Sequence, residues 1–510
     1  MRKKWFGALL LQRVWVTLLI ILQALFILYL LLTGSVLSMR LNHLLTAISL
    51  IAVLYIISKK DKGAYKLTWV FLILMFPVFG GALYLLFSLQ TSTRRFKKMQ
   101  DKQAQFRPAY HLPGNCYDQA AEKLSQHLPQ IRYLQQCAGF PIYDQTQVDY
   151  YSPGEAFFEA LIPELEKAER YIFLEFFIIE EGKMWGTILD VLERKAKQGV
   201  RVRLLYDDIG CFFTLPKNYA QRLRRMGIEC EVFNRFRPLV SVLQNNRDHR
   251  KIISIDGKVA FTGGINLADE YINAYEKHGH WKDSGVCVRG KAAWSLTVMF
   301  LDMWSLCTNG TEDVGAYYPW KDESCLINTD GFVQPYADSP MDHENVGEHV
   351  YLQIINSAKD YIYITTPYLI VDDSMISALM LAAKSGVDVR IITPRIWDKR
   401  MVHMTTRSYY RDLTKAGVKI YEYTKGFVHA KTFVSDEHIA TVGTTNLDFR
   451  SLYLHFECGV LMFGSSAVKE VKADFLKTLE NCQQITEKDC RANAFMRLMQ
   501  DILRLYAPLM

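Results

Sequence analysis

HRKIISID, at residues 249–256, recurs with the same spacing of its fixed positions as HAKTFVSD, at residues 429–436. Both stretches have the form H-x-K-x-x-x-x-D, and they start 180 residues apart. A Gly-led turn that ends in Asn follows each one, GGIN at residues 263–266 and GTTN at residues 443–446. A single copy of this pattern is a weak signal. Two complete copies with matching turns indicate an internal duplication.

The segments around the two motifs repeat in the same order. Three β-rich segments of the first copy match three of the second: residues 171–178, 199–206 and 227–232 match residues 361–368, 386–393 and 417–422. Helical stretches separate these segments, and Gly follows as a helix stop. Short apolar strands that alternate with helices predict a mixed α/β fold. We therefore predict two copies of one domain, at residues 130–325 and 326–510.

The side chains of the two motifs suit one shared site. Residues i and i+2 of an extended strand point to the same face, so we expect His249 to project with Lys251 and His429 with Lys431. If the two halves pack about a pseudo-twofold axis, both His–Lys pairs meet at one seam. Two imidazoles and two ammonium groups around one point are suited to chemistry at a phosphoryl group.

This chemistry needs the two histidines in different protonation states. One neutral imidazole can attack phosphorus to form a phosphohistidine, and the other, protonated, can give its proton to the leaving alkoxide. The lysines offset charge on the phosphate oxygens, and Asn266 and Asn446 can donate hydrogen bonds to them. The arrangement requires no metal and no cofactor. The nearest metal candidate elsewhere is HGH at residues 278–280, which we interpret as a solvated loop.

A carboxylate stands at the start of the strand after each motif, Asp283 in the first copy and Glu457 in the second. A catalytic imidazole needs a partner on its second nitrogen to fix its tautomer and orientation. We predict that these two acids orient the histidines. The sequence leaves open which acid serves which histidine, and which histidine is the nucleophile.

The net charge of +7 is unevenly distributed along the 510 residues. Residues 1–110 hold fifteen Lys and Arg against two Asp, which leaves a net charge of −6 for the rest of the chain. The basic excess lies with the most hydrophobic part and suggests anionic lipid headgroups. The acidic remainder argues against nucleic acid as a partner. Ten cysteines without metal-like spacing favour reduced, buried thiols.

Three apolar segments predict a membrane anchor in residues 1–89: residues 14–32, 44–57 and 67–89. Basic residues precede the first segment, which places its N-terminus inside. The second segment is short. The third contains FPVFGG, which permits a kink or a re-entrant hairpin, and basic clusters flank it on both sides. The number of spans, two or three, stays open; we expect residues 90–129 to be a linker and the large domains to be cytoplasmic.

The paired motifs resemble those of the phospholipase D superfamily. Four further stretches resemble bacterial cardiolipin synthases, over nearly the whole chain: FPVFGG (76–81), DEY (269–271), HWKD (280–283) and TPY (366–368). The resemblance implies two tandem phospholipase-D-like domains with pseudo-twofold symmetry, preceded by two or three transmembrane helices. It also implies transfer of a phosphatidyl group between two phosphatidylglycerol molecules in a multi-pass membrane enzyme, giving cardiolipin and glycerol.

The same resemblance implies roles for the motif residues. His249 is the nucleophile and His429 the acid and base, and the motif aspartates Asp256 and Asp436, which we count in the catalytic set, are more structural than chemical. Many members of the superfamily carry Ser after the first Gly of the turn, where Gly264 and Thr444 stand in this chain, which weakens any role for a hydroxyl at position 264.

Several alternatives use the same motifs. A phospholipase D-type hydrolase would release phosphatidate, and another phosphatidyltransferase would use a different donor, such as phosphatidylethanolamine. A nuclease would be expected to carry a basic cleft, whereas the globular part is net acidic. An inactive membrane scaffold would not be expected to keep both motifs intact. Oligomeric state, regulation and acyl-chain preference are beyond the sequence.

Overall fold

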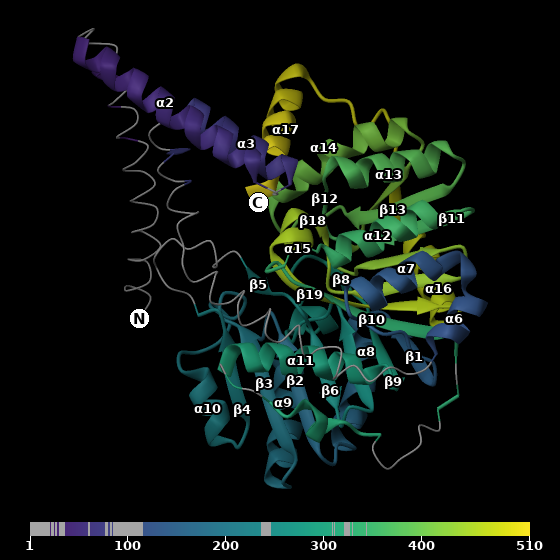
Figure 1. Cartoon of the computed structure of the whole chain (residues 1–510). Helices are drawn as coiled ribbons and strands as arrows, with labels where there is room; N and C mark the ends of the chain where they lie inside the picture. The colour runs from purple at the N-terminus through teal and green to yellow at the C-terminus, as the bar shows by residue number, and fades with distance from the viewer. Residues whose placement is uncertain are drawn as a thin grey trace. The chain divides into compact units, whose positions relative to one another are not determined.

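The structure is a computed structural model (Figure 1). It describes residues 36–59, 62–76, 116–235 and 246–509, with gaps at 309, 311, 321–326, 329 and 343 and a few isolated positions before residue 85. The chain divides into two compact units, which we describe separately. The first consists of Met1–Arg95, Phe236–Asn245 and Asp501–Met510, and the second of Phe96–Arg235 and Asn246–Gln500.

The described part of the first unit is helical. It contains α2 (Val36–Ser58), α3 (Gly63–Met75) and the end of α17 (Ala494–Tyr506). The hydroxyl of Thr68 on α3 donates a hydrogen bond to the backbone oxygen of Leu505 at 2.7 Å. The end of α17 is thereby tied to α3.

The structure describes different shares of the three predicted membrane segments. Residues 44–57 lie within α2, whereas residues 14–32 lie mostly outside the described part and 67–89 only partly within it. In the part of the chain that the structure describes, no helix is both long and apolar enough to cross a membrane. The membrane spans therefore stay predictions.

The second unit contains two large sheets with the same strand order. The first runs β1-β9-β7-β6-β2-β3-β4, and the second runs β10-β19-β17-β16-β11-β13-β14 with β20 added at its edge. In each, the three strands matched from the sequence are parallel, and the motif strand, β6 or β16, runs antiparallel to the first of them. The predicted duplication and the mixed α/β architecture are confirmed.

The strands of the first sheet are β1 (Thr146–Tyr151), β2 (Tyr171–Phe176), β3 (Arg201–Asp207), β4 (Glu229–Phe233), β6 (Ile252–Ile255), β7 (Val259–Gly263) and β9 (Gly285–Gly290). Those of the second are β10 (Phe332–Asp338), β11 (Tyr361–Thr365), β13 (Asp388–Pro394), β14 (Lys419–Tyr423), β16 (Thr432–Ser435), β17 (Ile439–Gly443), β19 (His455–Phe463) and β20 (Cys482–Ile485). The sheets thus lie within the predicted domains, whose boundaries stay predictions.

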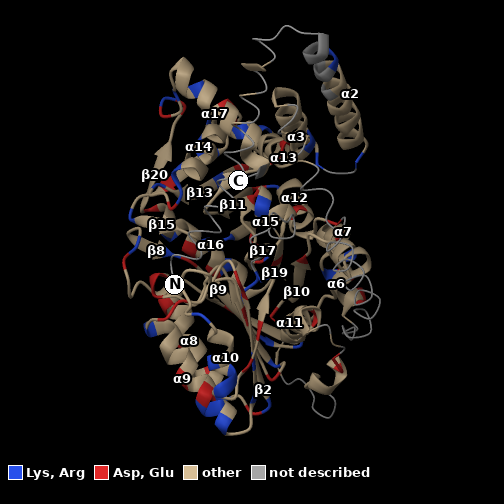
Figure 2. Cartoon of the chain, turned by 90° about the vertical axis from the view of Figure 1, so that its left-hand side faces the viewer, with Lys and Arg blue, Asp and Glu red and all other residues tan. Residues whose placement is uncertain are grey.

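Helices lie between many of the strands along the chain and supply much of the core. The longer ones are α8 (Gly154–Glu166), α9 (Lys183–Lys197), α11 (Ala293–Thr308), α12 (Val346–Ser357), α13 (Asp373–Lys384), α14 (Arg400–Lys415) and α16 (Ser466–Leu479), with the shorter α10 (Tyr219–Arg225) and α15 (Phe449–Tyr453). Gly199 and Gly386 follow α9 and α13 with φ of 92° and 98°, which is the helix stop that the sequence predicts. α8 carries acidic residues and no basic ones, α10 carries basic residues and no acidic ones, and α9 carries both (Figure 2).

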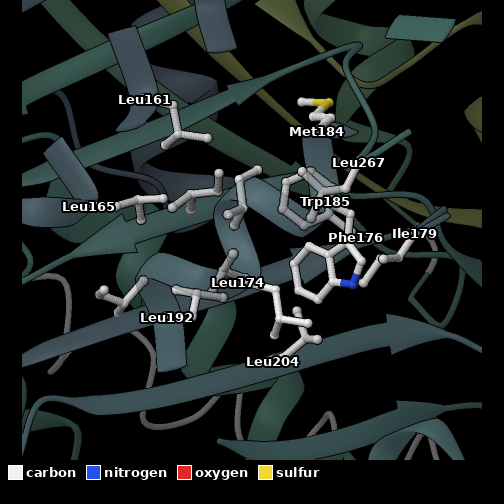
Figure 3. Packing of buried hydrophobic residues seen from close by; sticks show 14 of the residues in the cluster. Leu161, Leu165, Leu174, Phe176, Ile179, Met184, Trp185, Leu192, Leu204 and Leu267 are labelled. Atoms are coloured by element: carbon white, nitrogen blue, oxygen red, sulfur yellow. The ribbon is translucent and has the colours of Figure 1, made fainter. Parts of the chain in front are cut away.

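One hydrophobic cluster joins α8, α9 and the first sheet. Leu161 and Leu165 of α8 pack with Leu174 of β2, Trp185 of α9 and Leu204 of β3 (Figure 3), and all five side chains are buried. Burying a side chain of this size contributes roughly 1.5–3 kcal/mol. The cluster therefore fixes the strands that carry the first half of the site.

The end of the predicted linker is folded. Residues 90–115 lie outside the described residues, but helices follow at once: α6 (Tyr117–Lys123), η1 (Ser125–His127), α7 (Leu128–Arg132) and η2 (Tyr133–Cys137). Ile131 is fully buried, and Gln334 of β10 donates a hydrogen bond to its backbone oxygen at 3.3 Å. The sequence did not indicate this packing, because helices this short carry little hydrophobic periodicity.

Candidate active site

The catalytic candidates lie on the segments that lead into the two motif strands. β6 and β16 begin directly after the motif lysines, so each histidine and lysine stands just outside its strand and not within it as we predicted. Each pair still lies together. The ammonium group of Lys251 donates to the backbone oxygen of His249 at 2.6 Å, and Lys431 bonds His429 in the same way.

These lead-in segments pair with strands of the opposite copy, which is why they leave their own sheet. β5 (Arg247–Asp248) runs parallel to the start of β19, and β15 (Gly426–Val428) runs parallel to β8 (His280–Lys282). The backbone N–H of His249 donates a hydrogen bond to the backbone oxygen of Phe456 at 2.9 Å, and that of His429 donates to the backbone oxygen of Lys282 at 2.7 Å. The two copies therefore exchange the segments that carry their histidines.

The exchange places each histidine on the acid of the other copy. His249 Nδ1 lies 2.9 and 3.0 Å from the two carboxylate oxygens of Glu457, and His429 Nδ1 lies 2.6 Å from Asp283 Oδ2. Both carboxylates are fully buried. A carboxylate on Nδ1 fixes the ring and leaves Nε2 for chemistry. The two acids singled out from the sequence are thus in contact with the two histidines, in a crosswise pairing that the sequence left open.

The turns after the motifs support the two acids in different ways. The hydroxyl of Thr444 donates to Glu457 Oε2 and accepts a hydrogen bond from the backbone N–H of Cys458 at 2.9 Å. The equivalent position in the first copy is Gly264, where a Cβ would stand 2.1 Å from Asp283 Oδ1. Glycine at this position leaves room for the shorter acid, whereas threonine holds the longer one.

Burial sets the protonation of the site. It lowers the pKa of His249 well below its ordinary value, and the charge of Lys251 lowers it further. It also lowers the pKa of His429 to about 4, although the negative charge of Asp283 acts to raise it. Burial also lowers the pKa of Lys251 to about 8 and that of Lys431 to about 7. Without a bound anion both imidazoles are therefore neutral near pH 7, and Lys431 titrates in that range.

Aromatic rings pack on both histidines, with ring centroids 5.0–6.0 Å apart: Phe177 and His455 on His249, and Tyr271, Trp281 and Phe427 on His429. His455 is a residue of this site that sequence reasoning missed. Both its ring nitrogens are buried without a hydrogen-bond partner among the described residues, and its Nδ1 lies 3.8 Å from Glu457 Oε1. Aligning Asp283 with Glu457 places His455 opposite Trp281, which is the signal that points to it.

One group in the described part of the chain brings three possible metal ligands within 4.8 Å of one another: His249, His455 and Glu457. His249 and Glu457 already bond each other, as described above. Burial raises the pKa of Glu457 well above its ordinary value. Of residues 278–280, which we predicted to be a solvated loop, His278 and Gly279 do lie in a loop and are half-buried. His280 lies in β8, and its Nδ1 is 3.1 Å from the Tyr423 hydroxyl.

The motif aspartates lie at the other end of the motif strands. Asp256 accepts hydrogen bonds of 2.7–2.8 Å from the backbone N–H groups of residues 169–171, and Asp436 accepts bonds of 2.8–3.0 Å from those of residues 359–361. Both occupy left-handed turn positions, with φ of 53° and 52°. They tie each turn to the start of β2 or β11. These contacts favour the structural role that the resemblance implies, and a catalytic role for Asp256 and Asp436 stays a prediction.

The two asparagines of the Gly-led turns differ in their surroundings. Asn266 accepts a hydrogen bond from the backbone N–H of Ile178 at 3.0 Å and donates to the Tyr271 hydroxyl at 2.7 Å, so it helps to build the wall of the site. The side-chain oxygen of Asn446 is buried without a hydrogen-bond partner among the described residues. Contact of either amide with substrate stays a prediction.

A buried ion pair supports the first motif. Arg250, between the catalytic candidates His249 and Lys251, donates from Nε to Glu175 of β2 at 2.7 Å. Sequence reasoning missed this pair, although Glu175 is the only charged residue in the strand YIFLEF. The second copy has Ala430 at the position of Arg250. The two halves of the site are therefore similar in plan but not in every contact.

Comparisons with known proteins identify the family of the chain. The family described as "Cardiolipin synthase, PLD-like domain" matches residues 161–284 and 351–479, and "Phospholipase_D-nuclease N-terminal" matches residues 47–88. A cardiolipin synthase of Halalkalibacterium halodurans is 36% identical over 87% of this chain and 88% of its own. One of a Geobacillus species is 34% identical over 92% of this chain and 93% of its own.

A solved structure shows the same fold. Phosphatidylserine synthase from Haemophilus influenzae superposes with a TM-score of 0.53 at 14% identity, over 71% of this chain and 93% of its own. Each of the two regions matched by the cardiolipin synthase family contains one motif and the acid that serves the other motif. The family match and relatives of this identity along most of both chains show that the chain belongs to the cardiolipin synthase family of phospholipase-D-like enzymes.

Proposed function

We propose that this protein is a cardiolipin synthase that moves a phosphatidyl group from one phosphatidylglycerol to a second, with release of glycerol. The observation that carries the proposal is the crosswise bonding of His249 to Glu457 and of His429 to Asp283. It gives one site two imidazoles that are both oriented through Nδ1. Two oriented imidazoles are what a two-step phosphoryl transfer through a covalent intermediate requires.

In the first step His249 is the nucleophile. Its Nε2 attacks phosphorus, the bond from phosphorus to the glycerol oxygen breaks, and His429 gives its proton to that oxygen. Burial keeps His249 neutral, and a neutral imidazole has the free electron pair that attack needs. The bound phosphate anion, together with Asp283, favours the proton on His429.

In the second step the phosphohistidine is resolved by lipid. The terminal hydroxyl of a second phosphatidylglycerol loses its proton to His429 and attacks phosphorus, and the bond to His249 Nε2 breaks to give cardiolipin. Lys251 and Lys431 offset charge on the phosphate oxygens in both steps. An incoming lipid alcohol in place of water separates this reaction from hydrolysis.

The membrane part of the proposal rests on the N-terminal sequence. The apolar segments at residues 14–32, 44–57 and 67–89 would hold the enzyme in the cell membrane as a multi-pass protein with its catalytic domains on the cytoplasmic face. The basic excess of residues 1–110 supports contact with anionic headgroups. Labelling of single cysteines placed on either side of each segment, from outside and inside intact cells, tests this topology.

The function is tested by giving the full-length enzyme phosphatidylglycerol as its only lipid. We expect cardiolipin and glycerol in equal amounts. Phosphatidate without cardiolipin would replace the proposal with a phospholipase D-type hydrolase. Cardiolipin that forms only when phosphatidylethanolamine is added would indicate a different donor, and absence of any product with all donors would indicate a scaffold.

A further inference from the structure

The two copies carry matched loops with exposed apolar side chains, residues 208–218 after β3 and residues 395–399 after β13. These strands occupy the same position in the two sheets. Exposed apolar side chains stand in or next to both loops: Ile209 and Phe213 after β3, and Ile396, Trp397 and Met401 after β13. Phe213 is 83% exposed and Trp397 is 48% exposed, although both are large apolar residues. Matched exposure of this kind marks a surface that meets something other than water.

The first loop lies next to His249. The end of β3 contacts the segment that leads into the motif, because Asp207 accepts a hydrogen bond from the backbone N–H of Asp248 at 3.2 Å. In the loop itself, the Cys211 thiol lies 3.5 Å from the backbone oxygen of Phe177, whose ring packs on His249. Phe213 therefore stands two residues beyond a position that touches the wall of the site.

The second loop lies next to the same site from the other copy. Asp398 accepts a hydrogen bond from the Tyr368 hydroxyl at 2.6 Å, and Lys399 lies over the ring of Tyr368 at 5.7 Å. Tyr368 in turn packs against the buried cluster that includes Tyr271 and Trp281, two of the rings that lie on His429. Both loops thus rim the site, at the sheet edge where the parallel strands end and the motif strands begin.

We propose that these two loops dock the catalytic unit on a phospholipid bilayer that carries anionic headgroups. The inference deepens the proposed function and rests on it: both catalytic histidines are buried, and a lipid whose acyl chains remain in the bilayer must bring its phosphate to them. Arg395, Lys399 and Arg400 flank Trp397 in the sequence against one acid, Asp398, and this basic excess matches an anionic surface. Aromatic side chains with basic neighbours are the composition that a membrane interface favours.

The test compares one substrate in two physical states. Full-length enzyme is given phosphatidylglycerol in bilayers and, separately, a short-chain phosphatidylglycerol as dissolved monomers. We expect the double variant Phe213→Ala with Trp397→Ala to lose roughly tenfold in rate on bilayers and to keep its rate on monomers. Leu381→Ala is the matched control, because Leu381 is 63% exposed near the end of α13, at the opposite edge of the sheet.

A second measurement reads docking without catalysis. Bromine-labelled phospholipid in the bilayer should quench tryptophan fluorescence less in Trp397→Phe than in the parent enzyme, by the share that Trp397 contributes. Equal quenching in both, or a double variant with full rate on bilayers, would overturn the proposal. An equal loss on bilayers and monomers would also overturn it, because the loops would then act on the site itself. A parent enzyme that is inactive on both substrates would count against the proposed function, and the quenching result would still decide docking.

Discussion

Gly264→Ala gives a sharp prediction, because it adds one methyl group in the first copy and should disable the histidine of the second. The new Cβ would stand 2.1 Å from Asp283 Oδ1, 2.9 Å from its Cγ and 3.0 Å from Oδ2. Carbon and oxygen atoms that are not bonded approach to roughly 3.3 Å. The carboxylate must therefore retreat by about 1 Å. The bond of 2.6 Å from Asp283 to His429 would then exceed hydrogen-bond length.

The expected effect is on the rate and not on substrate affinity. A displacement of about 1 Å in a catalytic group costs about 100-fold in rate, which corresponds to about 2.7 kcal/mol of transition-state stabilisation. We expect kcat for cardiolipin formation to fall by at least this factor, with KM for phosphatidylglycerol little changed. The assay is the initial rate of the purified full-length enzyme in mixed micelles.

A matched control separates this effect from the general cost of changing glycine. Gly186→Ala lies within α9, where a Cβ would meet nothing within 4 Å, so it should keep full activity and raise helix stability by about 0.5–1 kcal/mol. Gly264→Ala with the kcat of the parent enzyme and an unchanged unfolding temperature would refute the reasoning, since the carboxylate would then have found another position that still serves His429.

Three further predictions concern stability. Asp256→Asn should lower the free energy of unfolding by about 1–3 kcal/mol, because Asp256 accepts three backbone hydrogen bonds, yet the folded enzyme should keep its kcat. A selective loss of kcat would instead support a catalytic role for this residue. His455→Phe keeps an aromatic ring and removes two buried nitrogens that have no hydrogen-bond partner among the described residues, so the unfolding temperature should hold or rise. A fall of several degrees would show that these nitrogens have partners. Acid should destabilise the fold, because the pKa of His429 is about 6.5 in the unfolded chain and about 4 in the folded one. Unfolding therefore takes up a proton between these pH values. As the pH falls through them, His429 alone should lower the free energy of unfolding by about 3 kcal/mol. Unfolding curves from pH 7 to pH 4 should show a smaller loss in His429→Gln, and an equal loss in both proteins would contradict the assignment.

Much of this architecture could be predicted because the sequence contains two matched copies of the same series of segments. The matched segments, the motif strands and the helix stops at Gly199 and Gly386 all fall where local pattern sets structure. The position of the two acids could also be predicted, since aligning the copies placed Asp283 opposite Glu457. Local pattern is strongest where one strand or one helix carries the signal.

The crosswise pairing of histidine and acid could not be predicted in the same way. It depends on β5 pairing with β19 and β15 pairing with β8, and strands of two or three residues carry no periodicity of their own. The role of Gly264 was equally hidden, because it depends on a clash with a side chain nineteen positions away. His455 stood outside the motif, and Glu175 stood in a strand interpreted only as apolar.

The central claim is that histidines from both copies act in one site through a covalent intermediate, and covalent labelling tests it most directly. Enzyme and phosphatidylglycerol labelled at phosphorus are mixed, quenched within the first turnovers and digested. We predict label on the peptide that contains His249, stable to base and lost in acid. Label should be absent in His249→Ala, and it should form and disappear slowly in His429→Ala. Label on any other residue, or cardiolipin formation at the parent rate in either variant, would contradict the account.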